Sequence, residues 1–196
     1  QYDPCYLEAI ARFHEVYARA LREPVREPTA VTLATADARG QPSARTVLLK
    51  GADERGFVVY TNSRSRKGRD LAANPRAGLL FFWPGMFEQV HVDGDVEIVS
   101  SEESDAYWQT RSRESRIGAW ASHQSDTLAA HEELEARLAD YEQQYAGTDV
   151  PRPGHWFGYR VVPSRIEFWQ SGQHRLHDRQ SYEKTPSGWR LRHLNP

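Results

Sequence analysis

The sequence predicts an α+β fold built on an antiparallel sheet or barrel with flanking helices. Apolar residues recur at helical spacing near the N-terminus and change to strand-like runs from residue 30 onward. Short turn sequences that end in glycine, at 37–40 and 53–56, separate the first of these runs. In total we expect about eight strands and three or four helices, and the short connections favour antiparallel pairing.

The first predicted element is a helix over roughly 4–22, because Asp3 can cap it and Pro4 suits the first helical position. Three strands then follow within 30–61, with the sequences AVTLATA, ARTVLLK and FVVYT. Their close spacing predicts a three-strand meander. A short helix over 63–73 comes next, and Asn74-Pro75 ends it.

Two strands are expected in the middle of the chain. The apolar run GLLFFW over 78–83 is typical of a buried strand, and Pro84-Gly85 forms a turn after it. The segment 87–99 alternates polar and apolar residues, which predicts a half-buried strand. Gly94 within it indicates a bulge or bend.

Two further helices and a set of strands complete the chain. Ser100 and Glu103 form a capping box for a helix over about 101–111. A longer helix over about 126–146 carries apolar side chains on one face. The last segments predict strands with the sequences WFGYRVV, RIEFWQ, RQSYEK and WRLRHL, and Pro163 separates the first two of them.

Composition and charge exclude several classes of protein. The 196 residues fit a single domain best, and 39% hydrophobic residues are enough for a real core. The net charge of −2 argues against a protein that binds nucleic acid or a membrane surface, because both need excess positive charge. Cys5 is the single cysteine, so neither a disulfide framework nor a thiolate metal cluster is expected, and the chain is expected to be cytoplasmic, with no metal and no membrane span.

Positive charge is concentrated in short segments. Segment 62–76 carries five basic residues against Asp70, at the start of a predicted helix where backbone N–H groups also favour an anion. Segment 107–116 offers a tyrosine, serines and arginines that suit a phosphate monoester. Segment 174–179 contains Arg175, His177 and Arg179, which would share one side if it is extended. For each segment the alternative is an ordinary solvated surface.

Familiar phosphate, hydrolase and metal motifs do not occur. The chain contains no GxxxxGK[ST] and no GxGxxG, which argues against nucleoside triphosphate chemistry and a Rossmann cofactor site. HExxH and GxSxG are also absent. Lys50, one of only three lysines, ends an apolar strand, where a lysine usually reaches solvent. The residues alone therefore indicate a protein that binds small phosphorylated ligands.

Five sequence blocks carry a resemblance to a known family. They are RTVLLK (45–50), YTNSRSRKGRDLAANPRAGLLFFW (60–83), EQVHVDG (88–94), YWQTRSRESRIGAWASHQS (107–125) and RIEFWQSGQHRLHDR (165–179). In this order they resemble the pyridoxamine 5′-phosphate oxidases. The resemblance implies a single domain over 1–196, an FMN-binding split β-barrel with a helical region at 1–26 and a family-like core at 27–196. It also implies a homodimer with active sites at the subunit interface.

The resemblance further implies the reaction and the residues that carry it. Pyridoxamine or pyridoxine 5′-phosphate would be oxidised by O2 to pyridoxal 5′-phosphate with release of H2O2, and of NH3 from the amine. Arg175 and His177 would act on the substrate as catalytic residues. The implied FMN-binding residues are Arg45, Thr46, Val47, Leu48, Leu49, Lys50, Tyr60, Thr61, Arg66, Lys67, Gln89, Gln124, Ser125, Trp169 and Arg179. The implied substrate-binding residues are Lys50, Tyr107, Arg111, Ser115, Arg175 and His177.

The chain departs from the family pattern at two places, and other functions stay open. Glu88 stands where the family commonly has a basic residue, which reverses a charge beside the expected flavin. The family's N-terminal arm, with an Arg and a Tyr that cover the substrate, has no match in this sequence. The alternatives are a related split-barrel oxidase of the phenazine pathway and a non-catalytic protein that binds FMN or pyridoxal phosphate.

Overall fold

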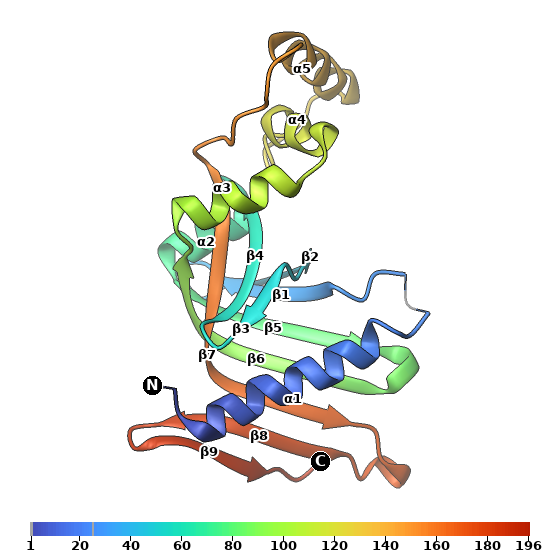
Figure 1. Cartoon of the computed structure of the whole chain (residues 1–196), viewed down its shortest axis with the longest axis vertical. Helices are drawn as coiled ribbons and strands as arrows, with labels where there is room; N and C mark the ends of the chain where they lie inside the picture. The colour runs from blue at the N-terminus through green and yellow to red at the C-terminus, as the bar shows by residue number, and fades with distance from the viewer. Residues whose placement is uncertain (1, 25) are drawn as a thin grey trace.

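The computed structural model describes residues 2–24 and 26–196; Gln1 and Val25, within the expected helical region 1–26, lie outside the described residues. Figure 1 labels the helices and strands. The helices are α1 (Pro4–Ala20), α2 (Arg66–Ala73), α3 (Ser101–Thr110), α4 (Arg113–Ala121) and α5 (His131–Gln144). The strands are β1 (Ala30–Ala36), β2 (Pro42–Leu48), β3 (Gly51–Asp53), β4 (Gly56–Asn62), β5 (Arg76–Trp83), β6 (Glu88–Ile98), β7 (Trp156–Gln170), β8 (Asp178–Thr185) and β9 (Gly188–His193).

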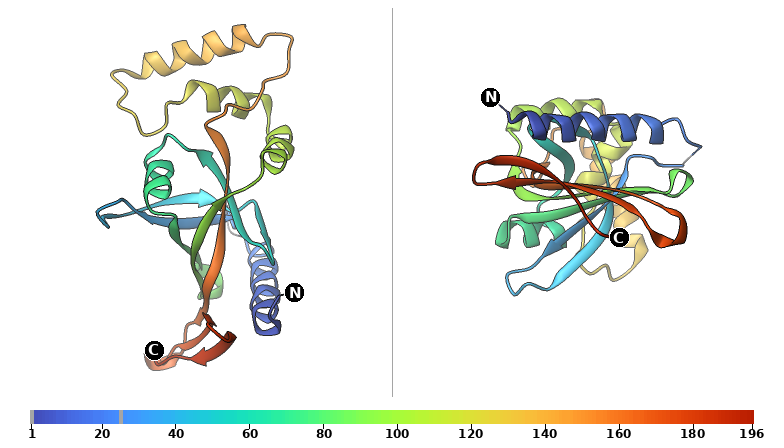
Figure 2. Two further views of the ribbon diagram at one scale, coloured as in Figure 1. Left: turned by 90° about the vertical axis from the view of Figure 1, so that its left-hand side faces the viewer. Right: turned by 90° about the horizontal axis from the view of Figure 1, so that it is seen from below.

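The nine strands of the described residues belong to one antiparallel sheet, which confirms the predicted α+β class. The sheet has the order β2-β1-β5-β6-β7-β4-β3, and β8 and β9 extend it from β7. It is strongly curled, so that β1 and β2 lie across the direction of β6 and β7 (Figure 2). One edge of β7 pairs with β6 over most of its length, and the other edge pairs first with β4 and then with β8.

Helix α1 covers one side of the sheet and begins as the sequence predicts. The Asp3 carboxylate accepts a hydrogen bond from the Cys5 N–H at 2.8 Å, and Pro4 occupies the first turn. The buried face of the helix includes Phe13, whose ring packs edge-on against Phe57 with centroids 4.8 Å apart. The Phe13 ring also packs against that of Phe81, with centroids 5.2 Å apart. The main hydrophobic core therefore lies between α1 and the sheet.

The predicted three-strand meander is wrong. Strand β1 does pair with β2, but its other neighbour is β5, while β4 pairs with β3 and β7. The chain changes partners just after β2, where the N–H of Leu49 donates to the Thr29 carbonyl oxygen and the N–H of Lys50 donates to that of Val58. The strands themselves were predicted correctly, but β4 does not join β1 and β2, and its long partner β7 comes from a distant part of the chain.

The two predicted strands around Pro163 form one strand, β7. Pro163 lies opposite Gly94, where the register between β6 and β7 shifts. A bulge tolerates a proline because a ladder hydrogen bond is already missing there. A Cβ at position 94 would collide with the carbonyl oxygen of Val162, so glycine is required at this bulge. The expected bend at Gly94 is confirmed, and it keeps β7 continuous.

The helical predictions are partly correct. The hydroxyl of Ser100 caps α3 by accepting from the Glu103 N–H at 3.1 Å, as expected. Helix α4 was not predicted separately, and it starts where the hydroxyl of Ser112 accepts from the Ser115 N–H. Helix α5 is shorter than the expected 126–146. Among the described residues, no helix has the length and apolar character needed to cross a bilayer.

Glu88, the departure from the family pattern, is a structural residue. Its carboxylate is buried beside α1 and accepts two hydrogen bonds from the Arg19 guanidinium, at 2.8 and 2.9 Å. This paired geometry is among the stronger ion-pair arrangements in proteins. The reversed charge is therefore matched by Arg19, and the pair fastens α1 to the start of β6.

We expect Arg19→Met to lower the free energy of unfolding by about 1–2 kcal/mol, because it leaves the Glu88 carboxylate buried without a partner. Half of the Arg19 side chain is exposed, which keeps the effect at this modest size. Urea denaturation measures the change. The matched control is Arg39→Met, since Arg39 is 88% exposed and lies 3.7 Å from Asp37. Equal effects of the two substitutions would contradict a structural role for the Arg19–Glu88 pair.

Candidate functional site

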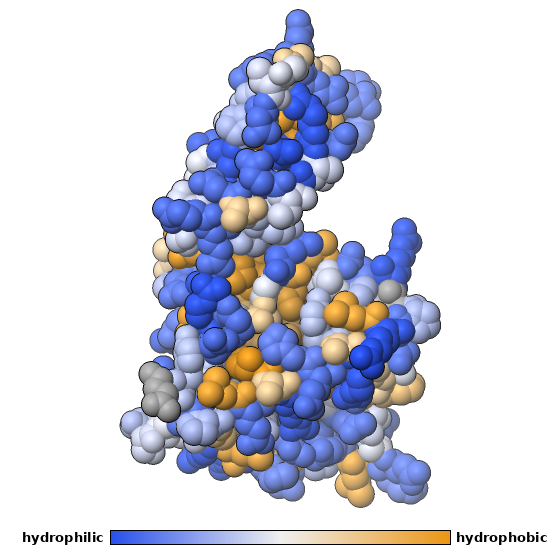
Figure 3. All heavy atoms as spheres, in the orientation of Figure 1, coloured by the Kyte–Doolittle hydropathy of each residue, from blue (hydrophilic) through white to orange (hydrophobic). Residues whose placement is uncertain are grey.

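A cavity of about 900 Å³ opens between β2, β4, α2, α3 and α4. This volume lies in the upper part of the range of about 300–1,000 Å³ that is typical of small-molecule sites. The surface is visibly hollowed between the helices and the strand β2, and hydrophobic side chains show inside the hollow (Figure 3). The lining residues are Arg45, Thr46, Val47, Leu48, Lys50, Tyr60, Thr61, Asn62, Lys67, Tyr107, Thr110, Arg111, Ser115, Gly118, Ala119, Ser122, Gln124 and Trp156.

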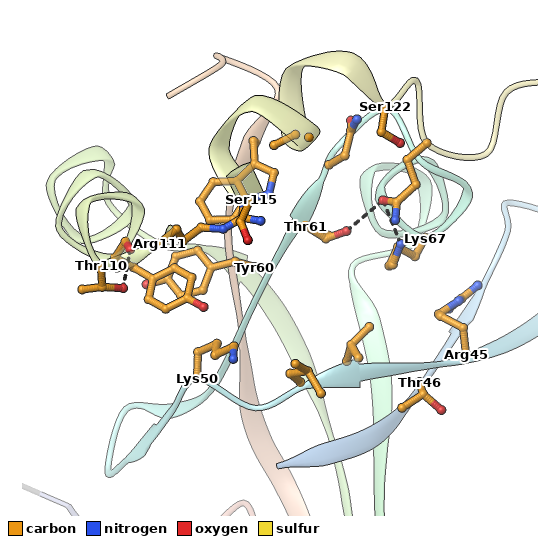
Figure 4. A pocket seen from close by; sticks show the side chains of 18 residues that line it. Arg45, Thr46, Lys50, Tyr60, Thr61, Lys67, Thr110, Arg111, Ser115 and Ser122 are labelled. Atoms are coloured by element: carbon orange, nitrogen blue, oxygen red, sulfur yellow. Dashed lines mark hydrogen bonds between the residues drawn. The ribbon is translucent and has the colours of Figure 1, made fainter. Parts of the chain in front are cut away.

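One side of the cavity carries Arg45 and Lys67 (Figure 4). Lys67 lies in the first turn of α2, whose start is capped by the hydroxyl of Ser65. The Lys67 ammonium donates to Gln124 Oε1 at 3.1 Å, and the hydroxyl of Thr61 donates to the same oxygen at 3.3 Å. Burial, with the nearby charge of Arg45, lowers the pKa of Lys67. Two cations next to each other at a helix start form a suitable site for an anion.

The other side of the cavity carries Arg111 against a group of aromatic rings (Figure 4). Its guanidinium carbon lies 4.7 Å from the ring centre of Trp156 and 5.4 Å from that of Trp108. Trp108 is itself fixed, because its indole N–H donates to the Val150 carbonyl oxygen at 2.8 Å. Burial lowers the pKa of Arg111. These rings hold the guanidinium in place by cation–π contact.

One nitrogen of Arg111, Nη1, is buried and has no hydrogen-bond partner among the described residues. A buried donor without a partner costs about 1–3 kcal/mol, so a ligand acceptor placed against Arg111 Nη1 would be stabilising. Ser115, in the first turn of α4, and Tyr107, whose ring stacks on Tyr60 at 4.1 Å, line the same part. Hydroxyl and guanidinium groups arranged in this way suit a phosphate.

The cavity brings together most of the residues that the sequence predicts. Twelve of them line it, namely Arg45, Thr46, Val47, Leu48, Lys50, Tyr60, Thr61, Lys67, Tyr107, Arg111, Ser115 and Gln124. Arg66 and Ser125 lie beside it, with the Arg66 N–H donating to the Ser125 hydroxyl at 3.1 Å. Leu49 is only 4% exposed and its side chain packs in the main core instead.

The remaining predicted residues form a second group, which does not line this cavity. Gln89 pairs with Trp169 across β6 and β7, and Trp169 lies beside Arg179 of β8. The ring of His177 packs on Trp169 with centroids 4.8 Å apart. We call Gln89, Trp169, Arg175, His177 and Arg179 the distal group.

The expected alternation of Arg175, His177 and Arg179 along an extended segment is wrong. The chain forms a short 3₁₀ turn at Gln173–Arg175, and Arg175 has a positive φ of 65°. The turn brings the N–H of Gly172 to His177 Nδ1 at 3.2 Å. Arg179 forms an ion pair with a carboxylate, since its Nε donates to Glu167 Oε1 at 2.8 Å. Burial favours the neutral form of Glu167, but Arg179 and Arg165 outweigh it and lower the pKa of this carboxyl.

Strand β7 keeps the distal group away from the cavity. It runs from Trp156, which lines the cavity, to Trp169 and Gln170 at its other end. At about 3.3 Å per residue, the 13 steps from Trp156 to Trp169 span up to about 43 Å of strand. Figure 1 shows α3 and α4 at one end of the molecule and β8 at the other. One chain therefore does not bring the two groups together.

Sequence reasoning missed several lining residues, among them Asn62, Thr110 and Trp156. Asn62 directly follows two predicted site residues on the same strand, so its position was a usable signal. Trp156 begins a predicted strand, but its contact with Arg111 depends on how β7 packs against α3. No local pattern in the sequence indicates that contact.

Comparison with known proteins gives matches over most of the chain. Residues 18–145 match the family model "Pyridoxamine 5′-phosphate oxidase", and residues 156–196 match "Pyridoxine 5′-phosphate oxidase C-terminal dimerisation region". A pyridoxine/pyridoxamine 5′-phosphate oxidase of Myxococcus xanthus is 54% identical over 189 residues, which cover 96% of this chain and 92% of the relative. The corresponding protein of Alkalilimnicola ehrlichii is 55% identical, covering 96% of this chain and 97% of the relative.

Two solved structures have the same curled sheet. PhzG from Burkholderia lata, in complex with tetrahydrophenazine-1-carboxylic acid, superposes with a TM-score of 0.91 at 35% identity and covers 100% of this chain and 98% of its own. A pyridoxamine 5′-phosphate oxidase-related, FMN binding protein from Nostoc punctiforme superposes with a TM-score of 0.75 at 18% identity, covering 94% and 97% of the two chains. These likenesses confirm the predicted split-barrel fold.

Sulfate tests the cationic cavity, because it stays a dianion at neutral and alkaline pH. We expect sulfate to raise the melting temperature above that in chloride of equal ionic strength. Because its pKa is lowered, Lys67 loses its proton at a lower pH than an ordinary lysine, whose pKa is about 10.4. The sulfate effect should therefore be largest below that lowered pKa and should shrink as the pH rises through it.

Lys67→Met should remove this pH dependence, whereas Lys184→Met, on β8, should keep it. Thermal melts in sulfate and in chloride over a series of pH values provide the measurement. A sulfate effect that is the same at every pH, or that persists unchanged in Lys67→Met, would show that Lys67 does not bind the anion.

Proposed function

Because this chain belongs to the pyridoxamine 5′-phosphate oxidase family and is an oxidoreductase, we propose that it oxidises pyridoxine or pyridoxamine 5′-phosphate to pyridoxal 5′-phosphate with FMN as cofactor. For the alcohol, one O2 is consumed and one H2O2 is formed. For the amine, water is also consumed and NH3 is released. The proposal depends mainly on one observation, the two separate groups of cationic and hydroxyl-bearing side chains in one cavity.

The residues that line the cavity fit FMN. Arg45 and Lys67 lie on one side and offer charge for the cofactor phosphate, with Thr61 and Gln124 beside them. Apolar side chains of β2, including Val47 and Leu48, provide a wall for a flat ring system. The chemistry that bound FMN supplies is two-electron oxidation, with O2 as the final electron acceptor.

The substrate phosphate is assigned to the other side of the cavity. Arg111 offers there a buried N–H that has no partner in the described part of the chain, and Ser115 and Tyr107 add hydroxyl groups. Lys50, between β2 and β3, adds a further charge to the same cavity. Each charge-assisted hydrogen bond contributes about 1.5–3 kcal/mol, so these groups together can bind the phosphate and orient the ring that it carries.

The distal group is assigned to the same active site through a second chain. Residues 156–196 match a dimerisation region, which supports a homodimer. In a symmetric dimer, the distal group of one chain can reach the cavity of its partner. Arg175 and His177 would then hold the amine or alcohol, and the His177 imidazole would accept the proton that it loses. Gln89, Trp169 and Arg179 would complete the flavin site.

A phenazine-type substrate is the second candidate, supported by the likeness to PhzG in complex with tetrahydrophenazine-1-carboxylic acid. The two substrates differ in their anionic group, a phosphate in one and a carboxylate in the other. The combination of Arg111, Ser115, Tyr107 and Lys50 provides more donors than a carboxylate can accept. This favours the phosphorylated substrate.

We expect the purified protein to be yellow and to convert pyridoxine 5′-phosphate in air to pyridoxal 5′-phosphate and H2O2 in equal amounts. Product absorbance and a peroxide assay, run in parallel, measure both. Pyridoxine without its phosphate is the matched control, and its kcat/KM should be at least about 100-fold lower because the phosphate contacts are lost. A colourless protein that stays inactive after FMN is added would exclude the oxidase.

A two-chain active site should allow complementation. Arg111→Ala and Arg175→Ala are each expected to be nearly inactive as homodimers. A mixed dimer, co-expressed with two different tags and purified by both, combines one doubly altered site with one intact site and should have about half of the wild-type kcat per dimer. The control pair, Arg111→Ala with Lys50→Ala, alters both sites and should stay inactive. An inactive Arg111→Ala and Arg175→Ala mixed dimer would contradict the shared site.

A further inference from the structure

We propose that Thr35 and Asp70 are positioning residues that hold the Arg45 guanidinium at the cavity in the orientation that binds FMN. Neither residue lines the cavity, and neither belongs to the predicted site. The hydroxyl of Thr35 donates to Asp70 Oδ2 at 2.7 Å and accepts from Arg45 Nη1 at 2.7 Å. The inference rests on the proposed function, because it concerns the affinity of this cavity for FMN.

The direction of these hydrogen bonds is determined by the groups themselves. A guanidinium only donates hydrogen bonds, and an ionised carboxylate only accepts them. The single hydroxyl proton of Thr35 must therefore point to Asp70, which leaves its lone pairs for Arg45. Thr35 is 3% exposed and Asp70 6%, so water does not compete for either group. The three residues form a chain of hydrogen bonds that can run in one direction only, from Arg45 to Thr35 and from Thr35 to Asp70.

The position of Thr35 supports a specific role. Strand β1 buries Val31, Leu33 and Thr35 on the same face, so a hydroxyl stands where the pattern requires an apolar side chain. Burying a hydroxyl is costly unless it is hydrogen-bonded, and here both of its bonds lead to charged groups. The buried Thr35 hydroxyl therefore stands at the point where it can bond to Arg45.

Asp70 also offsets the repulsion between the two cavity cations. Its Oδ2 lies 3.7 Å from Arg45 Nη2, and burial lowers the pKa of Arg45 while the charge of Asp70 raises it. The charge of Arg45 also lowers the pKa of Lys67, which lies on the same helix as Asp70. Since Asp70 does not line the cavity, it neutralises part of this charge without competing with an anion.

Two further acceptors complete the positioning of Arg45. Its Nη1 also donates to the Leu33 carbonyl oxygen at 3.1 Å, and its Nη2 donates to the Ser43 hydroxyl at 2.6 Å. These acceptors lie on β1 and β2, whereas Asp70 lies on α2. The contact through Thr35 thus adds a hydrogen-bonded link between the helix carrying Lys67 and the strand carrying Arg45, beside the direct ion pair of Asp70 with Arg45. It keeps the two cations at a constant spacing.

The test is a titration of the apoprotein with FMN, followed by quenching of flavin fluorescence. Thr35→Val keeps the shape of the side chain but removes the hydroxyl, and we expect the Kd for FMN to rise about tenfold. Thr35→Ser keeps the hydroxyl and should stay within about twofold of the wild type. Asp70→Asn, which removes the charge, is a second variant and should weaken binding in the same direction.

A double-mutant cycle separates positioning from a general structural effect. If Thr35 acts through Arg45, Thr35→Val should have almost no further effect on the Kd in an Arg45→Met protein. Tyr182→Phe is the matched control, because it also removes a buried hydroxyl that donates to a carboxylate, that of Glu8 at 2.8 Å, far from Arg45. It should leave the Kd unchanged, and melting temperatures of the apoproteins report the fold.

Three results would overturn the inference. The first is an unchanged Kd in both Thr35→Val and Asp70→Asn. The second is a full effect of Thr35→Val in the Arg45→Met background, which would show that Thr35 acts by another route. The third is a wild-type protein that does not bind FMN, and this result alone would also remove the proposed function.

Discussion

The hydrogen-bonded pairing of β7 is the constraint on which the other features depend. Its first half pairs with β4 and its second half with β8, while β6 covers the opposite edge. Fifteen residues are therefore held in one continuous strand. Trp156 at one end supports Arg111, and Trp169 at the other end contacts His177. The same strand that builds both halves of the proposed site also prevents one chain from joining them.

Burial of positive charge is the second feature that determines the properties of the cavity. Lys67, Arg45 and Arg111 all have pKa values lowered by burial, which means that folding makes their charged forms less favourable. Aromatic rings and a single carboxylate limit this cost without filling the cavity. An anionic ligand would reverse it, because it supplies the acceptor that Arg111 Nη1 lacks among the described residues. Relief of this unfavourable burial would thus contribute to the affinity for an anionic ligand.

Much of this could be predicted from the sequence, and the failures have physical reasons. Local signals such as Asp3-Pro4, the Ser100 N-cap and Gly94 were reliable because each depends on neighbouring residues. The partner of β4 was not predictable, since β7 lies about a hundred residues later and pairing across such a distance leaves no local pattern. The cavity residues occurred in recognisable blocks. Thr35 and Trp156, by contrast, contribute through contacts with other elements, a hydrogen bond to Arg45 and a cation–π contact with Arg111, which no local pattern indicates.

The separation of the two residue groups along β7 makes cofactor binding depend on the concentration of the protein. Under the proposed two-chain site, a cofactor in the cavity touches both subunits, so the free energies of cofactor binding and of subunit association are linked. Cofactor would then favour the assembled form, and dilution that separates the subunits would release it. The flavin content of such a protein becomes a function of its own concentration.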